Sequence, residues 1–222
     1  MVTFLLEILG TAAFAVTGAA AAIGKRLDIF GVLFVSVLSA VGGGVIRDVV
    51  LGNVPPLTFK NPVYIVTALG CAFAVMGAYV RLKGVYTQKR VVAVIDVCDA
   101  VGLAVFTVSG INIAVGMGYQ DNGFLLCFVG LVTAVGGGVL RDMAINRTPV
   151  IFKKEIYATA SIAGSAAYIW LYPLVGTHTA GWAAVFIIAV IRILSISKKL
   201  NLPVLASAGV KGPQGSCTGE KI

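Results

Sequence analysis

The sequence predicts an all-α integral membrane protein with seven transmembrane helices, arranged as two inverted three-helix repeats plus a seventh helix. Three observations indicate this fold class. Seven apolar runs are long enough to cross a hydrocarbon core of roughly 30 Å. Hydrophobic residues make up 59% of the chain and charged residues 12%, whereas soluble domains average roughly 45–50% and 25%. The first three runs also resemble the next three, and the last run has no counterpart.

The first apolar run extends from Thr3 to Gly24, and we expect the protein to retain it. A secretory signal peptide would begin with positive charge, which the residues before this run lack, and the run has a counterpart later in the chain. A short loop with Lys25 and Arg26 leads to the second run, residues 29–51.

Pro55 and Pro56 follow the second run and favour an extended turn there. The remaining spans are expected at residues 62–80, 91–117, 124–144, 156–175 and 180–196. This division gives a first three-helix repeat at 1–85, an inverted second repeat at 91–175, a seventh helix at 180–196 and a disordered cytoplasmic tail at 197–222.

The basic residues indicate how the chain sits in the membrane. Nearly all Lys and Arg of the loops and tail fall on one side of the seven spans, and only Lys60 falls on the other. The positive-inside rule then places the N-terminus outside and the C-terminus in the cytoplasm of a multi-pass cell-membrane protein. The net charge of +8 therefore reflects topology, so membrane lipids are expected partners and nucleic acid is not.

The internal repeat is visible residue by residue. Four residues of the first span recur with the same spacing in the fourth: Glu7, Gly10, Phe14 and Gly18 match Asp99, Gly102, Phe106 and Gly110. Because each half has three spans, an odd number, the two halves insert with opposite orientation. Inverted repeats of this kind are typical of permeation proteins whose pathway lies near the repeat axis.

Each half also carries a glycine triplet, Gly42, Gly43 and Gly44 in the second span and Gly136, Gly137 and Gly138 in the fifth. Each such glycine costs a helix about 1 kcal/mol relative to alanine. We expect glycine-broken helices whose bare backbone lines a watery cavity. The alternative is close helix packing, although three consecutive glycines occupy most of a turn and small-residue packing needs them on one face only.

An Arg–Asp pair follows each triplet after two apolar residues, as Arg47–Asp48 and Arg141–Asp142. Each charge would cost about 2.5–3.5 kcal/mol at a helix centre, so these side chains should face a partner or a pore. The two aspartates are placed closer to the membrane interface, where they would cap a helix or reach toward the headgroups.

Inversion predicts one carboxylate–guanidinium pair in each half, Glu7 with Arg47 and Asp99 with Arg141. Two roles stay open for these pairs: they staple helices together, or the arginines also line the pathway and set its field. Asp96, one helical turn before Asp99, adds a candidate cation or proton site, with helix-to-helix hydrogen bonding as the alternative.

The residues give no sign of an enzyme or of a metal site. His178 is the single histidine and is placed in an outside loop, and the four cysteines show no paired spacing. The glycine triplets lack the Gly-Lys-Ser/Thr ending of a phosphate loop. We therefore expect no cofactor beyond permeant ions.

The two inverted repeats, the doubled Gly-Gly-Gly-x-x-Arg-Asp motif and the unpaired seventh span resemble the prokaryotic relatives of the trimeric intracellular cation (TRIC) channels, a family also labelled uncharacterised or glycine transporter. The resemblance covers residues 1–196. It implies a homotrimer with one pore per protomer, conducting potassium or sodium between the kinked second and fifth helices. A Lys-Glu-Val motif, which animal members carry in the fourth span, is absent here, so voltage sensing and phosphoinositide binding are not implied.

Two functions remain open from the sequence. As a monovalent cation channel, the protein would pass potassium or sodium through cavities at the two glycine triplets. As a secondary transporter, the same repeat would rock around a midplane site, and the exposed helix N-termini would hold the carboxylate of a small amino acid such as glycine.

Overall fold

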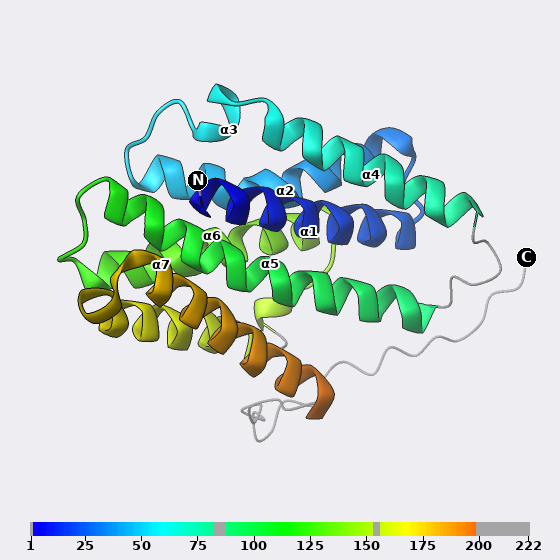
Figure 1. Cartoon of the computed structure of the whole chain (residues 1–222). Coiled ribbons are helices and arrows are strands. Elements are labelled where there is room, and N and C mark those ends of the chain that lie inside the picture. Colours follow the sequence, from blue (N-terminus) through cyan, green and yellow to red (C-terminus); the bar gives the residue numbers. More distant parts are fainter. Residues whose placement is uncertain (1, 82–87, 153–155, 199–222) are drawn as a thin grey trace, which may run out of the picture.

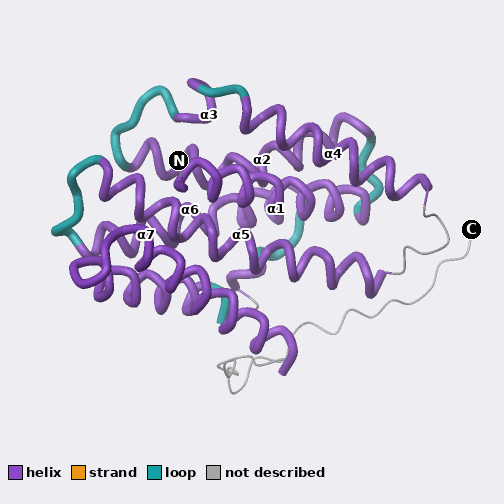
Figure 2. The backbone as a smooth tube through the Cα atoms, in the orientation of Figure 1, coloured by secondary structure: helices purple, strands orange, loops and turns teal. Residues whose placement is uncertain are grey.

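The computed structural model describes residues 2–81, 88–152 and 156–198, and within these ranges the chain forms helices and no strands (Figure 2). The elements are α1 (Val2–Gly24), α2 (Ile29–Val50), α3 (Leu57–Lys60), α4 (Val63–Arg81), α5 (Gln88–Gly116), α6 (Gly123–Ala144), the 3-10 helix η1 (Val150–Phe152) and α7 (Ala158–Lys198). Of the expected tail, residues 197 and 198 end α7, and residues 199–222 lie outside the described residues.

Six of the described helices are long and apolar enough to cross a membrane, and the last of them holds two spans. The 41 residues of α7 would measure about 60 Å as one rod, twice the thickness of a hydrocarbon core. Gly176 interrupts it with a φ of 78°, and Pro173 lies one turn earlier. The two arms fold back on each other (Figure 1) and correspond to the expected sixth and seventh spans, so His178 lies in a helical arm and not in a loop.

The two repeats begin their second helices in the same way. Asp28 Oδ1 accepts a hydrogen bond from the backbone N–H of Gly31 at 2.7 Å, and Asn122 Oδ1 accepts one from Leu125 at 3.0 Å. A side chain of this type satisfies a backbone donor that the first turn of a helix would otherwise leave free. The caps therefore fix the starts of α2 and α6 at equivalent places.

Helices α1 and α5 pack against each other at the centre of the molecule (Figure 1). The rings of Phe14 and Phe106 lie 5.3 Å apart. A Cβ on Gly10 would come within 2.8 Å of the Phe106 ring, and one on Gly102 within 2.8 Å of the Phe14 ring. Each glycine thus makes room for the phenylalanine of the other repeat, which is the reciprocal contact that an inverted repeat predicts.

Helices α2 and α6 cross in direct backbone contact at the glycine triplets. A Cβ on Gly43 would collide with the carbonyl oxygen of Thr133, and one on Gly137 with that of Ser39. A Cβ on Gly136 would lie 3.0 Å from the Cα of Gly43. Only glycine permits so close an approach of two helices.

This contact corrects the expected break at the triplets. Both helices continue through residues 42–44 and 136–138 with helical backbone. The alternative interpretation, close packing, describes these glycines better, because the backbone of one helix covers the backbone of the other. The close packing of the two helices offsets the helix propensity that the glycines lose. The glycines therefore serve this contact and not a water-lined kink.

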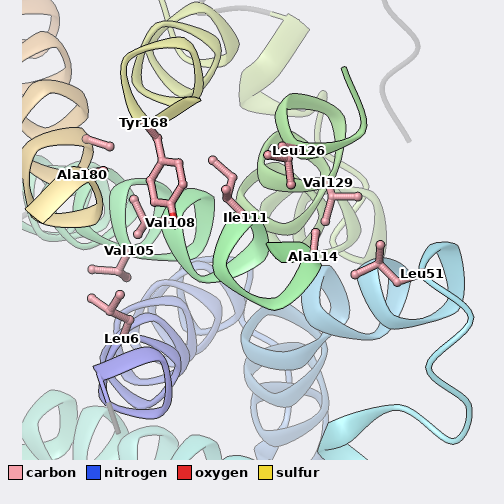
Figure 3. Close-up of a cluster of buried hydrophobic side chains, with 11 residues drawn as sticks. Leu6, Leu51, Val105, Val108, Ile111, Ala114, Leu126, Val129, Tyr168 and Ala180 are labelled. Atoms are coloured by element: carbon pink, nitrogen blue, oxygen red, sulfur yellow. The ribbon is translucent and has the colours of Figure 1, made fainter. Parts of the chain in front are cut away.

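An apolar cluster joins both arms of α7 to α5, with Tyr168 from the sixth span and Ala180 and Ala184 from the seventh. Figure 3 shows Tyr168 of α7 beside Val108 and Ile111 of α5, with Leu6 of α1 and Leu51 after α2 at the edge of the same cluster. The Tyr168 hydroxyl donates to Asn112 Oδ1 at 2.6 Å, so its polar end is also satisfied. The first arm of α7 therefore has a fixed position against α5, and the seventh span packs on the same cluster through Ala180 and Ala184.

We predict that Gly43→Ala and Gly137→Ala destabilise the fold, whereas Gly70→Ala does not. An added methyl group at either crossing glycine meets backbone that cannot move aside, and overpacking of this kind costs about 1–3 kcal/mol or more. Gly70 on α4 has no atom within 4 Å of the new Cβ. Thermal unfolding in detergent, followed by size-exclusion chromatography, should show a lower Tm for the first two variants. Equal Tm values in all three variants would contradict the crossing contact.

Candidate functional site: two buried charge clusters

The chain places its Arg–Asp pairs by ending α2 and α6 with the same backbone turn. The N–H of Asn53 donates to the Asp48 carbonyl at 2.8 Å, and the N–H of Arg147 donates to the Asp142 carbonyl at 2.8 Å. Gly52 (φ 74°) and Asn146 (φ 50°) supply the left-handed residue that such a Schellman ending requires. The last turn of each helix is therefore held in equivalent geometry.

Around the first turn lies the Arg47 cluster, which consists of Glu7, Arg47, Asp48 and Tyr64. Arg47 Nη1 donates to Glu7 Oε1 at 2.8 Å, and Arg47 Nε donates to Asp48 Oδ1 at 2.8 Å. The Tyr64 hydroxyl donates to the second oxygen of Glu7 at 2.6 Å. Helices α1, α2 and α4 each contribute to this cluster.

Around the second turn lies the Arg141 cluster, which consists of Thr17, Asp99, Arg141 and Asp142. Arg141 Nη1 donates to Asp99 Oδ1 at 3.1 Å and to the Thr17 hydroxyl at 3.0 Å. Arg141 Nε donates to Asp142 Oδ1 at 2.9 Å. Both ion pairs that the repeat predicts, Glu7 with Arg47 and Asp99 with Arg141, are therefore present.

The two aspartates that follow the arginines hold the next segment of the chain. Asp48 Oδ2 accepts the N–H of Leu57, the first residue of α3, at 2.7 Å. Asp142 Oδ2 accepts the N–H of Val150, the first residue of η1, at 3.1 Å. The expectation that they cap a helix is thus correct. Both aspartates are buried within the protein, with exposures of 0% and 1%, and their place near the membrane interface stays a prediction.

The third glycine of each triplet faces a charge cluster and not the helix crossing. The nearest atom to a Cβ on Gly44 would be Arg47 Nη2 at 3.7 Å. A Cβ on Gly138 would lie 3.5 Å from the Tyr157 hydroxyl oxygen and 3.8 Å from Arg141 Nη2. Gly44 also lines a cavity of about 20 Å³ together with Glu7 and Arg47, enough for about one water molecule. The triplets therefore have two functions, contact at the first two glycines and free space at the third.

The clusters lie at different depths of the molecule. Glu7 and Thr17 mark their positions along α1, and ten residues of α-helix correspond to about 15 Å. Helices α2 and α6 run antiparallel through their crossing, because Gly43 contacts Thr133 while Gly137 contacts Ser39. The two arginines consequently lie on opposite sides of the crossing.

The sequence did not single out four residues that belong to these sites or adjoin them. Tyr64 and Thr17 are hydrogen-bond partners of the clusters. Tyr157 hydrogen-bonds to Asp99 and carries the guanidinium of Arg192 over its ring, 4.6 Å from the ring centre. The available signal was Arg192 itself, a lone charge in the apolar run of the seventh span. Asp96 is only half-buried, and its role as a cation or proton site stays a prediction.

Comparison with known proteins extends over most of the chain. A family model described as "Glycine transporter" matches residues 4–80 and 96–173. The UPF0126 inner membrane protein YadS of Escherichia coli (strain K12) is 36% identical over 212 residues, 93% of this chain and 97% of the relative. A UPF0126 membrane protein of Vibrio cholerae is 35% identical over 206 residues, 91% of this chain and 82% of the relative.

Solved structures give the same result. A crystal structure of a prokaryotic TRIC channel in 0.5 M KCl matches with a TM-score of 0.83 at 33% identity. The match covers 91% of this chain and 99% of the chain in that structure. The chain belongs to the prokaryotic TRIC family. The TRIC orthologue from Rhodobacter sphaeroides has a TM-score of 0.80 at 34% identity, with 90% of this chain and 99% of that chain covered. These TRIC relatives are channels and not enzymes, in agreement with the sequence.

We predict that Arg47 and Glu7 contribute to folding stability in a coupled, non-additive way. Arg47→Gln leaves two buried carboxylates without their counter-charge, and Glu7→Gln leaves the guanidinium with one carboxylate fewer. Breaking a buried pair from one side costs about 3–5 kcal/mol, because the remaining charge is uncompensated. The double variant should lose less stability than the sum of the single variants by at least about 1 kcal/mol. Strictly additive losses in thermal unfolding would contradict this coupling.

Proposed function

We propose that this TRIC-family protein is a monovalent cation channel, conducting potassium or sodium, with one pathway in each protomer. The observation that carries the proposal is the symmetric pair of buried charge clusters on either side of the α2–α6 crossing. Each cluster has two carboxylates for one guanidinium, so each adds a formal charge of minus one to the protein interior. Intramembrane charges that face the bundle interior commonly mark an ion route.

The pathway that we propose passes the third glycine of each triplet. Carboxylate and hydroxyl groups lie near these positions, and oxygen atoms replace the water shell of a monovalent cation in selective pores. The arginines do not oppose a cation strongly, because each is paired with two carboxylates. Both arginines are 2% exposed, so the arrangement described here corresponds to a closed pathway.

The assembly and orientation belong to the same proposal. The Rhodobacter sphaeroides relative is a trimeric intracellular cation channel orthologue, and we propose a homotrimer for this chain as well. The distribution of Lys and Arg supports an outside N-terminus and a cytoplasmic C-terminus. The E. coli relative is an inner membrane protein, which supports a cell-membrane location here.

A carrier of a small amino acid is the second candidate. It is favoured by the description of the matching family model, "Glycine transporter", and by the inverted repeat, which many carriers share. The unbroken helices α2 and α6 weigh against it, because the carrier mechanism places the substrate carboxylate at helix N-termini that a break exposes.

The test is potassium flux from liposomes that contain the purified protein, repeated with a glycine gradient in place of the potassium gradient. We expect fast potassium flux in the wild type and no glycine uptake. Gly44→Ala should lower the flux several-fold, because the methyl group occupies the small space beside Arg47. Gly70→Ala, at an exposed position of α4 with no atom within 4 Å of the new Cβ, is the matched control and should conduct like the wild type.

Two results would overturn the proposal. Slow, saturable glycine uptake without potassium flux would establish the carrier. Potassium flux that is equal in Gly44→Ala, Gly70→Ala and the wild type would show that ions do not pass the third glycine.

A further inference from the structure

Seven charged side chains are buried in the described part of the chain, and six of them form the two clusters. The seventh is Arg192, on the second arm of α7, with 1% exposure. Because the second arm of α7 is the seventh span, which lies outside the two repeats, Arg192 has no counterpart in the first half. It therefore breaks the symmetry of the two sites.

The contacts of Arg192 are unusual for a buried arginine. None of its three guanidinium nitrogens has a hydrogen-bond partner among the described residues. The guanidinium lies over the Tyr157 ring, 4.6 Å from its centre, an arrangement in which the ring face attracts the cation. Tyr157 in turn hydrogen-bonds to Asp99 and lies beside Gly138. One aromatic ring thus separates Arg192 from the Arg141 cluster.

The formal charges of the two sites differ for this reason. The Arg47 cluster contains Glu7, Asp48 and one arginine, and its net charge is minus one. The Arg141 cluster contains Asp99, Asp142 and one arginine, and Arg192 brings the total at that site to zero. Because charges in a water-poor interior interact strongly, a cation should be held more favourably at the first site than at the second.

We propose that Arg192 is the counter-charge of the Arg141 cluster and makes cation conduction asymmetric, by disfavouring a cation at that cluster while the Arg47 cluster keeps its attraction. The inference rests on the proposed channel function and assigns a charge-tuning role to a residue of the seventh helix. A pathway with one attractive and one neutral end carries unequal currents in its two directions under equal and opposite voltages.

The test is single-channel recording in planar bilayers with the same KCl concentration on both sides. For each channel the larger current is divided by the smaller at equal and opposite voltages, which gives a rectification ratio that does not depend on the direction of insertion. The variants are Arg192→Gln, which removes the charge, and Arg192→Lys, which keeps it. Lys198→Gln removes one charge from the exposed end of the same helix and is the control.

We expect a wild-type ratio well above one at low salt. Arg192→Gln should bring it toward one, and Arg192→Lys and Lys198→Gln should leave it near the wild-type value. The wild-type ratio should fall only weakly between about 0.1 M and 1 M salt, because buried charges are screened much less than exposed ones. This measurement needs no variant and tests the proposal even if Arg192→Gln does not fold.

Three outcomes would overturn the proposal: a wild-type ratio of one at all salt concentrations, an Arg192→Gln ratio equal to that of the wild type, or equal changes in Arg192→Gln and Arg192→Lys. Glu155 lies outside the described residues and two positions before Tyr157 in the sequence. If the double variant Glu155→Gln/Arg192→Gln restores the wild-type ratio, Glu155 and not the Arg141 cluster is the partner, and the proposal also fails. Absence of any potassium current in the wild type would instead refute the channel function.

Discussion

The rest of the structure depends on the backbone contact between α2 and α6 at Gly43 and Gly137. Two antiparallel helices that touch at these glycines continue away from the crossing in opposite directions. Arg47 and Arg141, each four residues after its contact glycine, therefore lie on opposite sides of the crossing. The Phe14–Phe106 contact of α1 and α5 follows the same pseudo-two-fold arrangement and brings a carboxylate to each arginine.

The buried charges then determine which side chains must lie beside the two arginines. Arg47 and Arg141 are each paired with two carboxylates, whose remaining oxygens bind a hydroxyl or backbone N–H groups. This saturation explains how the chain tolerates six charges inside its repeats. It also leaves one unmatched negative charge in each cluster, which the seventh helix balances on one side only. An inverted repeat thus supplies two equivalent sites, and an element outside the repeat makes them different.

The spans, the repeat and the ion pairs could be predicted from the sequence, because apolar length and the cost of an unpaired charge act locally. The role of the triplets could not, since whether glycines bend a helix or admit a neighbour depends on the partner, here the Thr133 carbonyl. Tyr64 was missed because a hydroxyl in an apolar run is common and the repeat has Ala158 at the corresponding position. The hydrogen bond between Asp48 and the Leu57 N–H could not be predicted, because it depends on how the segment after α2 folds back over Asp48. The turn at Gly176 within α7 falls where the sequence places the loop between the sixth and seventh spans.

The two carboxylate-rich clusters should make the pathway selective for cations. The most direct measurement is the reversal potential of the reconstituted wild-type protein in a planar bilayer with a KCl gradient. A reversal potential close to the potassium equilibrium potential is the result that the buried clusters predict. A reversal potential near zero, or close to the chloride equilibrium potential, would contradict it and would leave the clusters with a purely structural role.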